Sequence, residues 1–211
     1  MPDSISLKIE TNIAIPMRDG VTLYADIYRP EGDGPFPTIL QRTPYDKTNA
    51  LSASMLDPIR SAKAGFAVVI QDTRGRHASE GEFYAFVDDI DDGYDTVEWA
   101  AAQPWSNGNV GMYGISYHGA TQLLAAVGAP PSLRAIVPAL TSDSYYDSWT
   151  YLGGVLQSWF ASVWAGGDLL ENISGSSPEK EEALAELGRW KSDVLSMERY
   201  VPLKDMPALK G

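Results

Sequence analysis

The sequence contains no cysteine and only two histidines among its 211 residues. A chain without cysteine can form neither a disulfide nor a thiolate zinc site. The sequence also lacks the H-E-x-x-H metal motif, the G-x-x-x-x-G-K-[ST] phosphate loop and the G-x-G-x-x-G dinucleotide motif. We therefore expect neither a metal ion nor another cofactor.

Long apolar runs and an excess of basic residues are also absent. No run approaches the roughly 20 apolar residues that cross a bilayer, and the first ten residues lack the layout of a signal peptide. We therefore expect a cytoplasmic protein. The net charge is −12, which repels phosphate groups, so neither nucleic acid nor a membrane is expected as a partner. The oligomeric state is left open.

The first 140 residues show the alternation of strands and helices that is typical of an α/β fold. Two alternating segments around Asp19-Gly20 predict an antiparallel hairpin over residues 7–15 and 21–28. Short continuous apolar runs then predict strands of a parallel sheet, and longer segments between them predict helices. The predicted strands cover residues 38–40, 66–70, 110–113 and 135–137, and the predicted helices cover residues 57–64, 88–102 and 117–127.

The character of the sequence changes after about residue 142. Tyrosine and tryptophan crowd the following stretch, no buried-strand pattern appears, and residues 179–195 favour a surface helix. We therefore divide the chain into a core over residues 1–142 and an incomplete helical insertion over residues 143–211. The aromatic side chains could line an acyl pocket or simply form the insertion's own core.

One segment has the pattern of a catalytic serine turn. Ser116 stands between the predicted strand at 110–113 and the predicted helix at 117–127, and Gly114 and Gly119 flank it. A sharp turn from strand to helix exposes a serine hydroxyl above the sheet, where a base can reach it. The helix start offers free N–H groups, of which that of Tyr117 is the natural oxyanion donor. The alternative is a small serine that merely fits a tight turn, because the common motif has glycine where His118 stands.

Several segments in this order resemble the cocaine-esterase and X-prolyl dipeptidyl-peptidase family of serine hydrolases. In that family the second glycine of the serine motif stands three residues after the serine, as it does here. The resemblance implies the α/β-hydrolase fold, with residues after 142 beginning a helical cap. The matching segments are residues 15–21, 42–47, 71–75, 79–83, 103–108 and 114–119.

The resemblance also implies a second oxyanion donor. The family's tyrosine in the Thr-Pro-Tyr-Asp segment, here Tyr45, donates its hydroxyl to the oxyanion together with the Tyr117 N–H. Without the family, Tyr45 would be read as a turn residue after Pro44. The expected reaction is hydrolysis of a small carboxylic ester, or of an X-Pro bond in a short peptide, through an acyl-enzyme on Ser116. The sequence does not choose between these substrates.

The base of a catalytic triad is missing from the sequence. His118 stands two positions after Ser116, and residues so spaced on a helix do not face each other. His77 lies in a loop, and no histidine follows His118. Because the family supplies its acid and histidine after the cap, we expect a truncated chain. The alternative to an active hydrolase is therefore a silent fragment that needs its missing C-terminal part or a partner chain.

Overall fold

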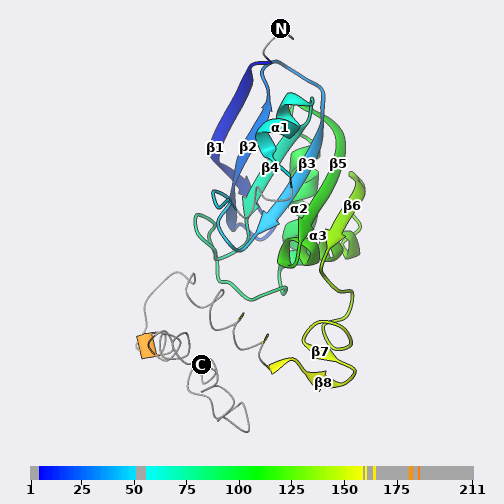
Figure 1. Cartoon of the computed structure of the whole chain (residues 1–211). Coiled ribbons are helices and arrows are strands. Elements are labelled where there is room, and N and C mark those ends of the chain that lie inside the picture. The colour runs from blue at the N-terminus through cyan, green and yellow to red at the C-terminus, as the bar shows by residue number, and fades with distance from the viewer. Residues whose placement is uncertain are drawn as a thin grey trace. The chain divides into compact units, whose positions relative to one another are not determined.

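The computed structural model describes residues 5–50, 56–158, 160, 164, 181, 182 and 185. Six strands of the described part form one sheet, and three helices pack against it (Figure 1). The elements of this sheet and its helices are β1 (Leu7–Pro16), β2 (Thr22–Pro30), β3 (Phe36–Thr43), α1 (Pro58–Lys63), β4 (Ala67–Asp72), α2 (Asp89–Ala101), β5 (Ser106–Ile115), α3 (Tyr117–Val127) and β6 (Leu133–Ala139).

The strand order across the sheet is β1-β2-β4-β3-β5-β6. β1 and β2 form the antiparallel hairpin that the sequence predicts, and β2 also runs antiparallel to β4. β4, β3, β5 and β6 run parallel to one another. The expected parallel sheet with an antiparallel N-terminal hairpin is therefore confirmed.

The direction of each crossover connection determines on which face of the sheet its helix lies. The connection from β3 to β4 through α1 moves one way along the sheet, and the connection from β4 to β5 through α2 moves the other way. Right-handed crossovers then place α1 and α2 on opposite faces. The step from β5 to β6 follows the same direction as α2, so α3 lies on the face of α2, and the two helices pack together.

The sheet interior is apolar at its centre and polar at one edge. All six residues of β4 are buried, which explains its nearly continuous run of branched apolar residues. Leu40 from β3 and Met112 from β5 join the same core. At the carboxyl ends of β3 and β4, however, the buried side chains are Arg42, Gln71 and Asp72. Because buried polar groups need hydrogen-bond partners, we expect these side chains to form a defined network of hydrogen bonds and ion pairs.

The chain divides into two compact units, Met1–Thr141 and Ser142–Gly211. In the second unit, β7 (Tyr151–Leu152) and β8 (Val155–Leu156) form a short antiparallel hairpin, where the sequence analysis expects no strand. Gly153 and Gly154, with φ of 58° and 81°, make its turn. Of the helix expected over residues 179–195, residues 181, 182 and 185 are helical, and the others lie outside the described residues. That this unit is a helical cap stays a prediction.

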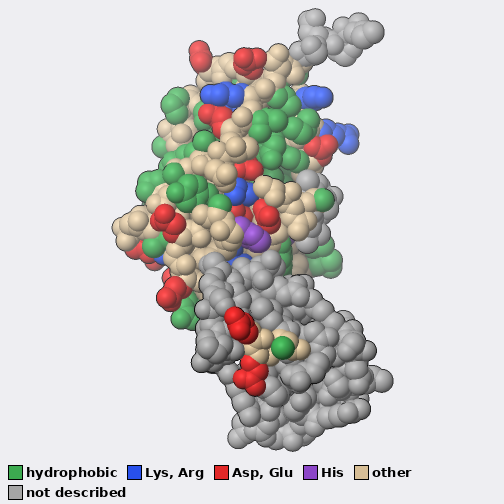
Figure 2. Space-filling view, turned by 90° about the vertical axis from the view of Figure 1, so that its left-hand side faces the viewer, with side chains coloured by type: hydrophobic (Ala, Val, Ile, Leu, Met, Phe, Trp, Pro, Cys, Tyr) green, Lys and Arg blue, Asp and Glu red, His purple; other side chains and the backbone are tan. Residues whose placement is uncertain are grey.

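The surface carries mixed charges. Figure 2 shows acidic and basic side chains interspersed with apolar ones on the face that it presents, without a continuous basic patch. Within the described residues, no helix is long and apolar enough to cross a membrane.

Candidate active site

Ser116 lies in a sharp turn between β5 and α3. Its backbone has φ 59° and ψ −121°, a conformation that a residue other than glycine rarely adopts. The Ser116 N–H donates to the Ala139 carbonyl oxygen at 2.8 Å, and the Ser116 carbonyl oxygen accepts from Gly119 at 2.8 Å and Ala120 at 3.0 Å. The Ser116 hydroxyl does not cap the helix, and the residue is partly exposed. Surrounding hydrogen bonds therefore hold a strained turn.

Two glycines explain the unusual spacing of the serine motif. A Cβ on Gly114, whose φ is 149°, would lie 2.3 Å from the Cβ of His118. A Cβ on Gly119 would lie 2.7 Å from Cγ2 of Thr141 and 3.2 Å from the Ala139 carbonyl oxygen. Gly114 thus makes room for the side chain two residues after Ser116, and Gly119 lets α3 approach the end of β6.

Tyr45 lies in the loop that follows β3. Its N–H donates to the Thr43 hydroxyl at 3.0 Å. Lys47 fixes the loop beyond it, because its Nζ and its backbone N–H each donate to the Asp72 carboxylate at 2.7 Å. On the other side, Nε of the buried Arg76 donates to the Pro44 carbonyl oxygen at 2.8 Å. Buried side chains at the end of β4 and in the loop that follows it therefore anchor the loop on both sides of Tyr45.

The aromatic rings of this edge bring the loops after β3 and β5 together. The Tyr45 ring meets the Tyr117 ring edge-on, with centroids 6.3 Å apart and planes at 79°. It also packs against the His118 ring at 5.6 Å. The structure therefore gathers the predicted site residues Ser116, Tyr45 and Tyr117 in one region, at the carboxyl ends of parallel strands, where ligands of α/β folds bind.

Neither histidine hydrogen-bonds to Ser116 within the described part of the chain. His118 is buried, its Nδ1 lies 3.0 Å from the Ile115 carbonyl oxygen, and its Nε2 has no hydrogen-bond partner among the described residues. Burial lowers the pKa of His118, and the hydrogen bond to Ile115 opposes that change. Nε2 of His77 lies 3.2 Å from the Pro44 carbonyl oxygen, and its Nδ1 lies 3.9 Å from Asp46. Neither ring is placed as a base for Ser116.

The acidic residues at the start of α2 form a buried ionic network that the sequence analysis does not find. Nη1 of Arg42, which is fully buried, donates to Asp89 at 2.8 Å. Arg74 binds Asp92 at 2.6 Å and 3.0 Å. The helix dipole alone would explain acids at a helix start, and the arginines that pair with them here lie 47 and 18 positions away in the sequence. The one signal in the sequence is that Arg42 and Arg74 lie in the segments that resemble the family, residues 42–47 and 71–75.

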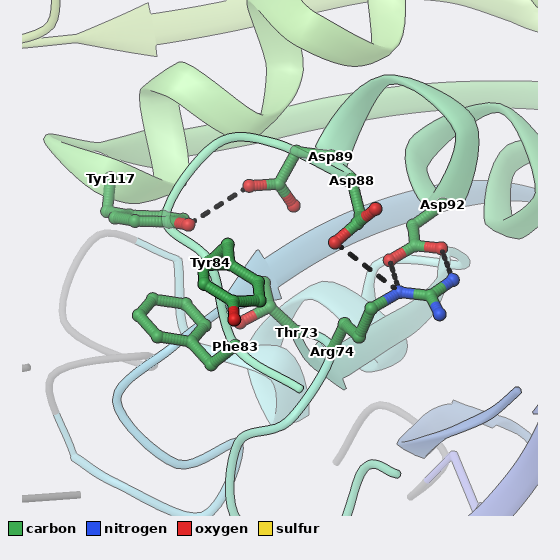
Figure 3. A pocket seen from close by; sticks show the side chains of 8 residues that line it. All are labelled: Thr73, Arg74, Phe83, Tyr84, Asp88, Asp89, Asp92 and Tyr117. Atoms are coloured by element: carbon green, nitrogen blue, oxygen red, sulfur yellow. Dashed lines mark hydrogen bonds and ion pairs between the residues drawn. The ribbon is translucent and has the colours of Figure 1, made fainter. Parts of the chain in front are cut away.

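A small cavity lies beside this network, lined by residues from the loop after β4, from the first turn of α2 and from the start of α3 (Figure 3). The Tyr117 hydroxyl donates to Oδ2 of Asp89 at 3.0 Å on one side of it, and Arg74 meets Asp92 on the other. Within the described residues, no cluster of histidine, aspartate and glutamate has an arrangement suited to a metal ion. The lining residues are Thr73, Arg74, Phe83, Tyr84, Asp88, Asp89, Asp92 and Tyr117.

Known proteins resemble this chain in sequence and in structure. Residues 19–207 match the family of X-Pro dipeptidyl-peptidases (S15 family). Cocaine esterase of Rhodococcus sp. (strain MB1 Bresler) is 42% identical over 209 residues, which are 95% of this chain and 36% of that protein. A CocE/NonD family hydrolase from Staphylococcus aureus superposes with a TM-score of 0.72 at 30% identity, covering 80% of this chain and 34% of that one.

An alpha-amino acid ester hydrolase also superposes, with a TM-score of 0.67 at 26% identity, over 98% of this chain and 39% of that one. The chain therefore spans about a third of the length of these relatives. The sequence match, the strand order and the superpositions agree on the α/β-hydrolase fold that the sequence analysis expects. The chain belongs to the X-Pro dipeptidyl-peptidase (S15) family.

Proposed function

We propose that this chain carries the nucleophile and the oxyanion donors of a serine hydrolase that forms an acyl-enzyme on Ser116. The turn at Ser116 is the observation that supports this most strongly. A strained serine, with φ 59°, stands directly between a parallel strand and a helix N-terminus. Such strain persists only where the surrounding structure holds it, and it concentrates at functional sites.

The proposed chemistry follows from the groups around that serine. The Ser116 Oγ attacks the carbonyl carbon of the substrate, its proton passes to a base that neither histidine of this sequence is placed to provide, and the negative charge develops on the carbonyl oxygen. When the carbonyl re-forms, the bond to the alcohol or amine breaks, this group leaves with a proton, and the acyl group stays on Oγ. The N–H of Tyr117, at the positive end of α3, and the hydroxyl of Tyr45 donate hydrogen bonds to that oxygen. Losing one such donor typically costs about 10²–10³ in kcat.

The substrate class follows from the relatives and remains divided between two kinds of bond. One relative is named a cocaine esterase, and the family is named for X-Pro dipeptidyl-peptidase activity. We propose small carboxylic esters or X-Pro bonds of short peptides. Both reactions use the same nucleophile and oxyanion donors, so the site described above does not distinguish them.

A specific observation favours the second candidate, a catalytically silent chain. The sequence contains two histidines, and neither is hydrogen-bonded to Ser116 in the described residues. A serine hydroxyl without a base is a weak nucleophile. We therefore expect the 211-residue chain alone to hydrolyse esters weakly or not at all, and to need an acid and a histidine from further sequence or a partner chain.

A chimeric protein tests the proposal. In it, this chain replaces the matching 36% of the Rhodococcus cocaine esterase, which supplies the rest of the fold. The proposal predicts turnover of an activated ester by the folded chimera and a loss of at least about 10⁴-fold in Ser116→Ala. A folded chimera without turnover, or a Ser116→Ala chimera that keeps it, contradicts the proposal. Clear Ser116-dependent turnover by the chain alone contradicts the silent-chain candidate.

A further inference from the structure

The hydroxyl of Tyr117 has a defined partner on each side. The residue is fully buried, and its hydroxyl donates to Oδ2 of Asp89 at 3.0 Å (Figure 3). The same oxygen accepts the N–H of Phe86 at 3.1 Å, and the Phe86 ring stacks on the Tyr117 ring at 4.5 Å. A ring that served packing alone would need no hydroxyl, because burying a hydroxyl costs free energy unless it is hydrogen-bonded.

Asp89 is itself fixed from the sheet. Its Oδ1 accepts Nη1 of Arg42 at 2.8 Å, and Nε of Arg42 donates to Gln71 at 2.8 Å. All three side chains are buried. Burial raises the pKa of Asp89, and the Arg42 guanidinium opposes that rise. A continuous line of hydrogen bonds therefore runs from β3 and β4, through the first residue of α2, to the first residue of α3.

Tyr117 adjoins both groups proposed as oxyanion donors. Its own backbone N–H is one of them, and its ring meets the Tyr45 ring edge-on at 6.3 Å. It also directly follows Ser116, whose strained φ of 59° depends on the start of α3 staying in place. A shift of the Tyr117 side chain would therefore move the helix start, and with it the nucleophile's backbone.

We propose that Asp89, held by Arg42, is a positioning residue that acts through the Tyr117 hydroxyl to fix the oxyanion donor and the turn at Ser116. The inference rests on the proposed function, because it assigns a purpose to groups around the same nucleophile. Preorganised donors need no rearrangement during the reaction. A misplacement of about 1 Å can cost about a hundredfold in rate.

Tyr117→Phe in the full 211-residue chain gives the first test, with Tyr113→Phe as the matched control. Tyr113 is also buried and lies on the strand that leads to Ser116, but its hydroxyl has no hydrogen-bond partner in the described residues. We expect the amide NMR signals of positions 116 and 117 to shift and broaden in Tyr117→Phe and to stay unchanged in Tyr113→Phe. Unchanged signals in both variants would overturn the proposal.

The chimera gives the kinetic test of the same pair. We expect Tyr117→Phe to lower kcat by about 10- to 100-fold with KM unchanged within about twofold, since only the transition state uses the donor. Tyr113→Phe should keep the parent kcat. Equal kcat in the two variants would overturn the positioning role. Ser116→Ala separates the two claims. If the Ser116→Ala chimera keeps its activity, the proposed function itself is overturned. If Ser116→Ala is inactive but Tyr117→Phe is unaffected, only the positioning role is overturned.

A double-mutant cycle connects the effect to Asp89. We expect Asp89→Ala to lower kcat at least as much as Tyr117→Phe, and the double variant to lose no more than Asp89→Ala alone, because the two groups act through one hydrogen bond. Multiplied losses in the double variant would show that Asp89 acts by another route. Tyr117→Phe alone keeps the inference testable if Asp89→Ala, which leaves Arg42 without this partner, fails to fold.

Discussion

Gly114 and Gly119 determine whether the turn at Ser116 can form. Their need is steric, because both positions face atoms that a Cβ would overlap. A sequence pattern can point to such glycines but cannot say which neighbour requires them. That His118 occupies the space beside Gly114 becomes visible only in the fold, and it removes the objection that the motif's glycine stands one position late.

Gly114→Ala should therefore be strongly destabilising. The added Cβ would lie 2.3 Å from the Cβ of His118 at a φ of 149°. We expect the free energy of unfolding to fall by about 2–5 kcal/mol in urea denaturation. Gly111→Ala on the same strand is the control, since its Cβ would meet its nearest atom, the Ala135 carbonyl oxygen, at 3.7 Å. Similar losses in both variants would contradict the steric account.

His118 should make the stability depend on pH. Burial lowers its pKa, so the folded chain stays neutral at this ring while the unfolded chain binds a proton below about pH 6.5. Its share of stability is complete above that pH and is lost as the pH falls, by at most about 1.4 kcal/mol per pH unit.

We expect His118→Gln to flatten the fall in unfolding free energy as the pH decreases below about 6.5, measured by urea denaturation at each pH. His77→Gln is the matched control, because the His77 ring is partly exposed and does not lie in the core. The interpretation fails if His118→Gln keeps the full slope.

Among the elements, α2 is the one whose role the sequence conceals. Its pattern predicts a helix over residues 88–102, and the helix spans Asp89–Ala101. The acidic first turn, however, pairs with arginines from the ends of β3 and β4, and no local pattern states this. Ionic partners so far apart in sequence are brought together only by the parallel strand order.

Asp92→Asn should accordingly destabilise the chain far more than Asp91→Asn. Asp92 is buried and binds Arg74 at 2.6 Å, so Asp92→Asn removes a buried charge-assisted pair. Because Arg74 is partly exposed and keeps its 2.8 Å pair with Asp19, we expect a cost of about 1–3 kcal/mol. Asp91 on the same turn pairs with Arg18 at 2.8 Å, but its side chain is 66% exposed, and we expect no measurable loss. Thermal and urea unfolding of both variants would reveal this contrast. Equal effects would mean that the network is not important for stability.

Local patterns also predict the elements of the sheet better than those of the second unit. The hairpin β1–β2 has a clear alternating pattern, and β3, β4 and β5 have apolar runs that are buried in the fold. The apolar run over residues 135–137 correctly predicts β6, although β6 has no buried residue. The strands β7 and β8 have two residues each, which is too short for any alternation to appear. Their pairing depends on the turn at Gly153 and Gly154. The aromatic residues around these glycines make the turn hard to recognise in the sequence.

Across the molecule, the chain has the strained turn at Ser116, and neither of its two histidines hydrogen-bonds to Ser116 within the described residues. The loops after β3, β4 and β5 meet at the carboxyl ends of the parallel strands and carry Tyr45, Arg76 and Ser116. Asp72, the last residue of β4, anchors the first of these loops together with Arg76. The sequence analysis predicts the serine from its own pattern and Tyr45 only through the family resemblance. The anchors escape it, since their importance lies in contacts with a loop some 30 residues away.

A prediction at the scale of the whole molecule concerns the origin of the groups that activate Ser116. The chain covers 36% of the cocaine esterase that it resembles. We expect the histidine and the acid that activate Ser116 to come from sequence beyond these 211 residues. Supplying that sequence should therefore convert a silent serine into a nucleophile.

The most direct measurement is the covalent labelling of the cocaine-esterase chimera by a serine-reactive fluorophosphonate, with the modified peptide identified by mass spectrometry. The account predicts one label, on the peptide that contains Ser116, and none in the Ser116→Ala chimera. A label on a different serine, or undiminished labelling of Ser116→Ala, would contradict the claim that Ser116 is the nucleophile.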